Sequence, residues 1–150
     1  MEMDALLARL QVLEDERAIL QTLYQYGHAM DYGPDADFID CFAPGGVWDV
    51  RMRKTPSGAF TCAGHGEIAA SLAAQTSVRA PALYAKHLLV EPRIVLDGDE
   101  ASVESYFVRI EPRDDGPTQI VASGRYLDRL IRCADGCWRF TQRIAEIDDM

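Results

Sequence analysis

The second half of the chain contains three Asp-Gly pairs, Asp97-Gly98, Asp115-Gly116 and Asp135-Gly136. Asp-Gly tolerates the positive φ angles that tight β-hairpins require. Each pair separates two strand-like runs, and the four runs surround residues 83–96, 101–111, 119–132 and 138–147. Three hairpins in succession predict an antiparallel meander of four strands.

The first half has helical periodicity instead. Ile19, Leu23, Tyr26 and Met30 form one apolar stripe, which predicts a helix that begins with Asp15 as its N-cap. The pair Gly33-Pro34 predicts its end, because glycine suits the residue after a helix and proline cannot continue one.

Shorter elements follow this helix. We expect a second helix capped by Asp35 or Asp37, a strand through residues 47–50 with a short partner around Phe60, and a third helix over residues 64–77. Helices followed by a meander predict an α+β fold, with the helices packed on one face of a curved sheet.

Length and charge limit the classes of function. A chain of 150 residues suits a single domain, here residues 1–150. The net charge of -9 argues against binding to nucleic acid or to anionic membranes, which both require clustered basic residues. No window approaches the ~20 apolar residues of a membrane span, and the N-terminus lacks a secretory signal pattern, so we expect a cytoplasmic protein.

The cysteines and histidines do not have metal-ligand spacing. Cys41, Cys62, Cys133 and Cys137 are expected to be reduced apolar residues, although Cys133 and Cys137 could also form a disulfide across a hairpin. His28, His65 and His87 are scattered along the chain. We therefore expect no metal site and no cofactor.

His87 lies near the start of a strand that could be wholly apolar. The even positions of this strand, such as Leu88 and Ile94, are more apolar than the odd positions that His87 shares. A β-bulge near Pro92 would change which set faces inward. A hydrogen-bonded core histidine and a catalytic histidine both remain open interpretations.

Other side chains could also serve chemistry. Asp31, the last residue before the helix stop, could be a general base or could orient a histidine; it could also be a solvated surface acid. Arg125 and Arg143 lie in the last two predicted strands, where one guanidinium could stabilise an anion in a pocket while others pair with surface acids. Five aromatic residues could form the core or line a cavity: Tyr24, Tyr26, Trp48, Tyr106 and Phe107.

The segments "DERAILQTLYQYGHAMDYGPDADFIDCFAPGGVWDV", "AKHLLVEPRI" and "SGRYLDRLIRCADGCWRFTQR" together resemble the SnoaL-like branch of the nuclear transport factor 2-like superfamily. The resemblance implies a cone of curved antiparallel sheet closed by N-terminal helices. Asp31 and His87 match the Asp–His dyad of scytalone dehydratase and hexachlorocyclohexane dehydrochlorinase, and Arg143 lies where the dehydrochlorinase has an anion-stabilising arginine. Tyr26 replaces a pocket lysine of that enzyme.

This resemblance implies a cofactor-independent lyase or isomerase that acts on a small, cyclic, largely apolar compound. Asp31, His87 and Arg143 would be its catalytic residues. The substrate would contact Tyr24, Tyr26, Trp48, Tyr106, Phe107 and Arg125. The alternative is a non-catalytic small-molecule-binding module, or the small subunit of a ring-hydroxylating dioxygenase. In either case we expect a homodimer or homotrimer, because an open curved sheet leaves a face and edges to cover.

Overall fold

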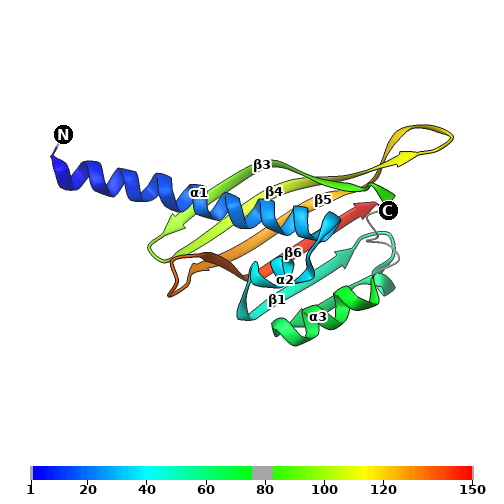
Figure 1. Cartoon of the computed structure of the whole chain (residues 1–150), viewed down its shortest axis with the longest axis horizontal. Coiled ribbons are helices and arrows are strands. Elements are labelled where there is room, and N and C mark those ends of the chain that lie inside the picture. The colour runs from blue at the N-terminus through cyan, green and yellow to red at the C-terminus, as the bar shows by residue number, and fades with distance from the viewer. Residues whose placement is uncertain (1, 76–82, 150) are drawn as a thin grey trace.

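The computed structural model describes residues 2–75 and 83–149, and in this part of the chain three α-helices lie on one side of a six-stranded sheet (Figure 1). The helices are α1 (Met3–Tyr32), α2 (Asp35–Asp40) and α3 (Gly64–Ala74), and a 3-10 turn, η1, lies at Pro56–Gly58. The strands are β1 (Phe42–Met52), β2 (Phe60–Ala63), β3 (Lys86–Asp97), β4 (Glu100–Arg113), β5 (Gly116–Arg132) and β6 (Trp138–Asp149). The predicted α+β class is therefore confirmed. Thr76 and Ser77, at the predicted end of the third helix, lie outside the described residues.

The sheet has the strand order β2-β1-β6-β5-β4-β3. The meander β3–β6 is antiparallel throughout, as predicted. However, β1 pairs with β6 in parallel, so the sheet is mixed and not wholly antiparallel. This pairing joins strands far apart in the chain, and no local turn signal encodes it.

Two of the three Asp-Gly turns have the expected backbone. Gly98 and Gly136 adopt φ angles of 61° and 82°, a region that glycine enters without steric cost. Gly116 is instead the first residue of β5, and the turn lies at residues 114–115. The three hairpins exist, but the second one, between β4 and β5, uses a different turn.

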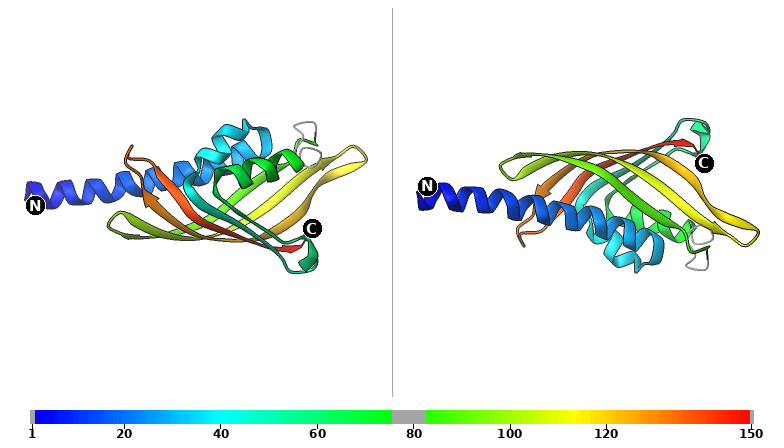
Figure 2. Two further views of the ribbon diagram at one scale, coloured as in Figure 1. Left: turned by 90° about the horizontal axis from the view of Figure 1, so that it is seen from below. Right: turned by 90° about the horizontal axis from the view of Figure 1, so that it is seen from above.

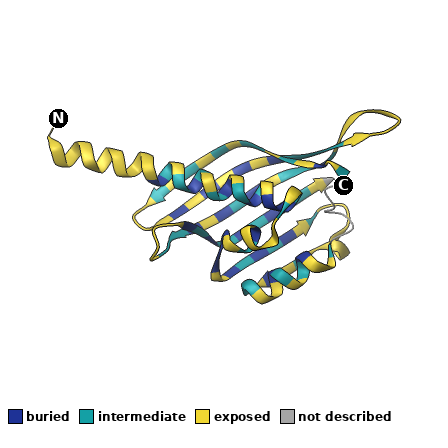
Figure 3. Cartoon of the chain, viewed as in Figure 1, coloured by how far each residue is buried: buried dark blue, intermediate teal, exposed yellow. Residues whose placement is uncertain are grey.

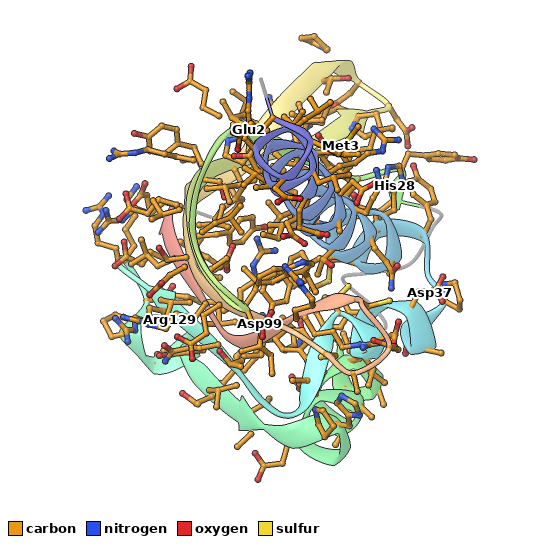
Figure 4. All side chains as sticks on the ribbon, turned by 90° about the vertical axis from the view of Figure 1, so that its left-hand side faces the viewer. Glu2, Met3, His28, Asp37, Asp99 and Arg129 are labelled. Atoms are coloured by element: carbon orange, nitrogen blue, oxygen red, sulfur yellow. The ribbon has the colours of Figure 1, made fainter. Side chains whose placement is uncertain are left out.

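The sheet curves around the interior, and the helices lie on its inner side (Figure 2). A view along α1 shows side chains filling the space between this helix and the curved sheet (Figure 4). Ile19, Leu23 and Tyr26 of α1 are buried there, which confirms the predicted stripe. None of the described helices combines the length and the apolarity that a bilayer crossing requires.

The first helix begins at Met3, twelve residues before the predicted start at Asp15. Asp15 is a buried residue within the helix, where its carboxylate accepts hydrogen bonds from Arg132 Nη2 at 2.5 Å and Trp138 Nε1 at 3.1 Å. The carboxylate thus anchors the helix to the sheet and does not cap it. The turns before Asp15 extend beyond the sheet and are exposed (Figure 3).

Candidate active site

A β-bulge in β3 turns His87 toward the interior. The pairing of β3 with β4 shifts register between Val90 and Arg93, and Glu91 adopts a φ angle of 50°. His87 and Leu89 are half-buried before the shift, whereas Ile94 and Leu96 are the half-buried positions after it. The bulge near Pro92 considered from the sequence is confirmed, and it explains why an odd-numbered histidine shares the inner face with even-numbered apolar residues.

Asp31, in the last turn of α1, contacts His87 at two points. Its Oδ2 accepts a hydrogen bond from the backbone N–H of His87 at 2.6 Å, and its Oδ1 lies 2.5 Å from His87 Nδ1. The two side chains are only 7% and 18% exposed, respectively. A carboxylate beside Nδ1 favours the tautomer that carries its proton on Nδ1, which leaves the Nε2 lone pair available to accept a proton.

Asp31 and His87 lie in the wall of a cavity of about 200 Å³ between the helices and the sheet. Much of the wall is apolar, including Met30, Val50, Phe60, Phe107, Ala122 and Ile147. Its groups able to hydrogen-bond include Tyr26, Asp31, Gln75, His87, Arg109 and Tyr126. A cavity of about 150 Å³ accommodates benzene, so this one has room for a single ring with small substituents.

Two tyrosines with neutral hydroxyl groups, Tyr26 and Tyr126, line the cavity. Burial raises the pKa of Tyr26 to about 12, and burial also raises the pKa of Tyr126 well above its ordinary value. Both phenols therefore stay protonated at neutral pH. Tyr26 Oη accepts a hydrogen bond from Trp48 Nε1 at 3.2 Å, and the Tyr126 ring stacks on Phe107 with centroids 4.6 Å apart.

Of the aromatic and basic residues predicted to contact a substrate, Tyr26, Trp48 and Phe107 line the cavity. Tyr106 and Arg125 do not, because they are register partners on the outer face, where both are exposed and Arg125 pairs with Glu146. Tyr24 is also exposed and borders a groove between α1 and β3, which Asp31 and His87 also line. Helix and strand periodicity account for these three differences, since each side chain points away from the enclosed side.

Arg143 lies behind the cavity wall and does not line it. Its side chain is fully buried and donates from Nε and Nη2 to Asp128, at 2.8 and 2.9 Å. Its guanidinium carbon lies 4.1 Å from the ring centre of Tyr26 and 3.7 Å from that of Tyr126. Two of its nitrogens thus bind Asp128 and its flat face packs on the two rings, whereas Nη1 is buried without a hydrogen-bond partner.

Tyr126, Arg109 and Gln75 line the cavity but were not predicted to do so. For Arg109 and Tyr126 a signal was available: alternation along β4 puts Arg109 on the same face as Phe107, and alternation along β5 puts Tyr126 in phase with buried Leu130. Gln75 follows the end of α3 and has no such pattern.

Comparisons with known proteins agree with this fold. The sequence profile of the SnoaL-like domain family matches residues 11–144. No curated protein matches the sequence significantly.

The similar solved structures share so little sequence identity with this chain that they support a likeness of fold alone. An NTF2-like protein with a cystatin-like fold from Novosphingobium aromaticivorans is 23% identical, with a TM-score of 0.82 over 97% of this chain and 90% of that one. A proposed β subunit of an aromatic-ring-hydroxylating dioxygenase from the same organism is 23% identical, with a TM-score of 0.75 over 93% and 92%. A Catenulispora acidiphila protein in complex with S-DNPA is 22% identical, with a TM-score of 0.73 over 90% and 94%.

Proposed function

The chain belongs to the SnoaL-like domain family, and from this premise we propose that it is a single-domain, cofactor-independent lyase or isomerase acting on a small, cyclic, largely apolar compound. The observation that carries the proposal is the double contact between Asp31 and His87 in the wall of a mostly apolar cavity. A histidine held by a carboxylate beside a substrate-sized cavity suits proton abstraction from carbon.

In the proposed reaction, His87 Nε2 takes a proton from a substrate carbon next to a carbonyl group. The electron pair of the broken C–H bond forms an enolate. In an isomerase, the imidazolium returns the proton to another carbon; in a lyase, the pair forms a carbon–carbon double bond and the leaving group departs with its own bonding electrons. Asp31 orients the ring and stabilises the imidazolium in both cases.

The enolate oxygen needs a hydrogen-bond donor, and the tyrosine hydroxyls supply one. Tyr26 and Tyr126 both line the cavity as neutral phenols. In this proposal Arg143 is a positioning residue, because its guanidinium packs against both rings from behind. A fixed donor in a site of low polarity stabilises a developing anion more strongly than water does.

The test is proton exchange in D₂O, followed by NMR, with six-membered cyclic ketones that carry or lack a β leaving group. On any compound that the wild type turns over, Asp31→Asn should lower the rate by about 10³–10⁴-fold, since an amide mis-sets the imidazole tautomer. His87→Gln should cost about as much, and the double variant little more, because the two residues act as a unit. Full activity of Asp31→Asn would exclude this mechanism.

His28→Gln is the matched control for this series. His28 is an exposed histidine on the same helix, one turn before Asp31, and it does not line the cavity; it borders the groove between α1 and β3, which Asp31 and His87 also line. Its replacement should leave exchange unchanged. An equal loss of activity in His28→Gln would point to a general effect of the helix end and not to the Asp31–His87 pair.

A non-catalytic role is the second candidate: a binding module, or a small subunit of a ring-hydroxylating dioxygenase. It is supported by the likeness of fold to a proposed dioxygenase β subunit. Co-purification with a large iron–sulfur subunit from the source cells, in constant ratio, would favour this role. Exchange activity in the isolated chain would favour the enzyme.

We also propose a homodimer or homotrimer, because the free end of α1 carries unburied apolar side chains. They are Met3, Leu6, Leu7, Leu10, Val12 and Leu13. Met3 and Leu10, and likewise Leu6 and Leu13, are seven residues apart, the repeat of a helix that packs along another helix. Light scattering should give a multiple of 16.7 kDa for the wild type and a lower mass for Leu6→Glu with Leu10→Glu. A monomeric wild type would contradict this proposal.

A further inference from the structure

One side of α1 carries a heptad repeat from its first turn to its last. The first set of positions, seven residues apart, is Met3, Leu10, Arg17, Tyr24 and Asp31. The second set, three residues after each of the first four, is Leu6, Leu13, Leu20 and Gly27. These residues, which we call the α1 seam, are exposed or half-buried, unlike Ile19 and Tyr26, which face the sheet. Such a repeat is the pattern of a helix that packs along a second helix.

The α1 seam passes through two different surroundings. Its first part, from Met3 to Leu13, lies on the turns that extend beyond the sheet, where its apolar side chains are exposed (Figure 3). Its second part, from Tyr24 to Asp31, borders the groove between α1 and β3, whose opposite wall includes the exposed side chain of Leu88. Both parts leave apolar surface in water, and one uninterrupted helix joins them.

The two parts have matching lengths. With a rise of about 1.5 Å per residue, the extension over residues 3–14 is about 18 Å long, and the stretch of α1 that lines the groove, residues 23–32, is about 15 Å long. The extension of one copy can therefore lie antiparallel along the groove of a second copy, while its own groove receives the extension of that copy. A two-fold axis near the middle of α1 relates the two contacts, so one surface serves both copies.

The side chains of the seam are complementary in this antiparallel register. In a packed helix pair, each residue of the seam fits between residues of the facing helix. With the axis between residues 18 and 19, Leu10 lies opposite Gly27 of the partner subunit, which lines the groove without a side chain. Leu13 lies opposite Tyr24 of the partner subunit. The seam thus places a large residue against a small one and an aliphatic residue against an aromatic one.

Arg17 is the basic residue of the seam, and it lies near the axis. In this register it faces Leu20 of the partner subunit, with Glu16 of the partner subunit one turn away. Arg17 is exposed and Glu16 is half-buried, so an ion pair between them adds little affinity. It does favour this register over one that places the two copies of Arg17 side by side.

We propose that the groove between α1 and β3 binds the N-terminal turns of α1 from a second copy of this chain, in a two-fold dimer in which each subunit completes the site of its partner. Asp31 and His87 line this groove as well as the cavity. Leu6 of the partner subunit lies opposite Asp31 and covers the contact between Asp31 and His87 from the groove side. Excluding water there strengthens the interaction between the carboxylate and the imidazole. This inference rests on the proposed function for the role of that pair, and it specifies the interface of the proposed association.

Disulfide cross-linking tests the register. The background protein carries Cys133→Ser and Cys137→Ser, so that the remaining cysteines are buried. In this background, Leu13→Cys with Tyr24→Cys should give a disulfide-linked dimer after mild oxidation with diamide. Either substitution alone should not, because two copies of one of these positions lie far apart in the antiparallel pair. Val12→Cys with Tyr24→Cys is the matched control and should stay unlinked, since Val12 is an exposed residue of the same extension but lies on the other side of the helix from the seam.

Three results would overturn the interface. A cross-link in Leu13→Cys alone would indicate helices that are not antiparallel in this register. Equal cross-linking of the Val12→Cys control, or none in Leu13→Cys with Tyr24→Cys, would place the extension elsewhere. A monomeric wild type in light scattering would leave the groove to a small molecule or to an unrelated protein.

The low-field NMR signal of the proton on His87 Nδ1 tests whether the partner completes the site. This signal, identified by its absence in His87→Gln, should be visible in the wild-type dimer. It should be lost through exchange with water in the monomeric variant Leu6→Glu with Leu10→Glu. Val12→Glu leaves the seam intact and should retain both the dimer and the signal. An unchanged signal in the monomeric variant would overturn the role of the partner in the site.

None of these measurements depends on turnover. The expected cross-link in a protein whose Asp31→Asn variant is fully active would refute the proposed mechanism alone. Loss of activity in that variant without the cross-link would refute this interface alone.

Discussion

The buried ion pair between Arg143 and Asp128 leads to a prediction about stability whose sign depends on which charges are removed. Both side chains have no exposed surface, and two hydrogen bonds join them. Arg143→Met keeps much of the aliphatic volume but leaves the Asp128 carboxylate buried without its partner. Breaking a buried pair in this way costs about 3–5 kcal/mol, which for a chain of this size lowers Tm by roughly 6–20 °C.

Removing both charges should cost much less. The double variant Asp128→Leu with Arg143→Met no longer has to desolvate two ions, and such replacements are often neutral or stabilising. The double variant should therefore be more stable than Arg143→Met alone. The two residues are register partners, so their effects are expected to be strongly coupled.

The stability of the single variant Arg143→Met should also depend on pH. Burial raises the pKa of the Asp128 carboxyl, and Arg143 acts in the opposite direction. Without Arg143 the pKa of Asp128 rises further. A folded-state pKa above the unfolded value means that the folded state holds a proton that the unfolded chain releases, so the free energy of unfolding falls as pH rises through that interval. Arg143→Met should lie nearest the wild type at acidic pH and lose stability from about pH 4, the ordinary pKa of an aspartate, up to the raised pKa of Asp128.

Urea denaturation followed by circular dichroism, at several pH values from 4 to 8, measures these differences for the wild type and the two variants. Two results would refute the reasoning. One is a double variant no more stable than Arg143→Met; the other is a cost of Arg143→Met that does not change with pH.

Two further changes test the packing of the sheet and of α1. In Gly124→Ala the new Cβ would lie 1.8 Å from the carbonyl oxygen of Glu146, so the strands must shift. The expected loss in free energy of unfolding is about 1–3 kcal/mol or more. Gly45→Ala, whose new Cβ has nothing within 4 Å, should change this free energy by no more than about 0.5 kcal/mol. Asp15→Ala removes the acceptor that anchors α1 to β5 and β6 and should cost about 2–3 kcal/mol, against little for exposed Glu14→Ala. Denaturation curves give the free energy of unfolding of all four variants. Equal stability of Gly124→Ala and Gly45→Ala would contradict the close approach at Gly124, and equal stability of Asp15→Ala and Glu14→Ala would contradict the anchoring role of Asp15.

The features of the fold that local chemistry encodes could be predicted from the sequence. The apolar stripe of α1 and the hairpins of the meander each depend on residues near one another in the chain. The parallel pairing of β1 with β6 could not be predicted, because nothing near either strand specifies the other as its neighbour. The early start of α1 was missed for a different reason: Asp15 is a good N-cap residue by type, but the distant Arg132 and Trp138 bind its carboxylate.

The candidate site was harder to predict, because two one-residue register shifts decide which side chains face inward. The first is the bulge between Val90 and Arg93 in β3. Uninterrupted alternation, with the more apolar even positions inward, would place His87 on the outer face. Pro92 indicates where such a bulge can occur, but it does not specify that one is formed. The resemblance of "AKHLL" to a family motif supplied what periodicity could not.

The second shift lies between Arg129 and Leu130, in the pairing of β5 with β6. Leu130 pairs with Phe140, and without the shift Asp128 would lie opposite Gln142; with it, Asp128 lies opposite Arg143. Because Arg143 and Asp128 both face inward and lie opposite one another, the aspartate neutralises the charge of the arginine within the sheet. The guanidinium is thereby held away from a ligand. The pairing of Arg143 with Asp128 therefore depends on the register between two strands, which alternation along a single strand cannot specify.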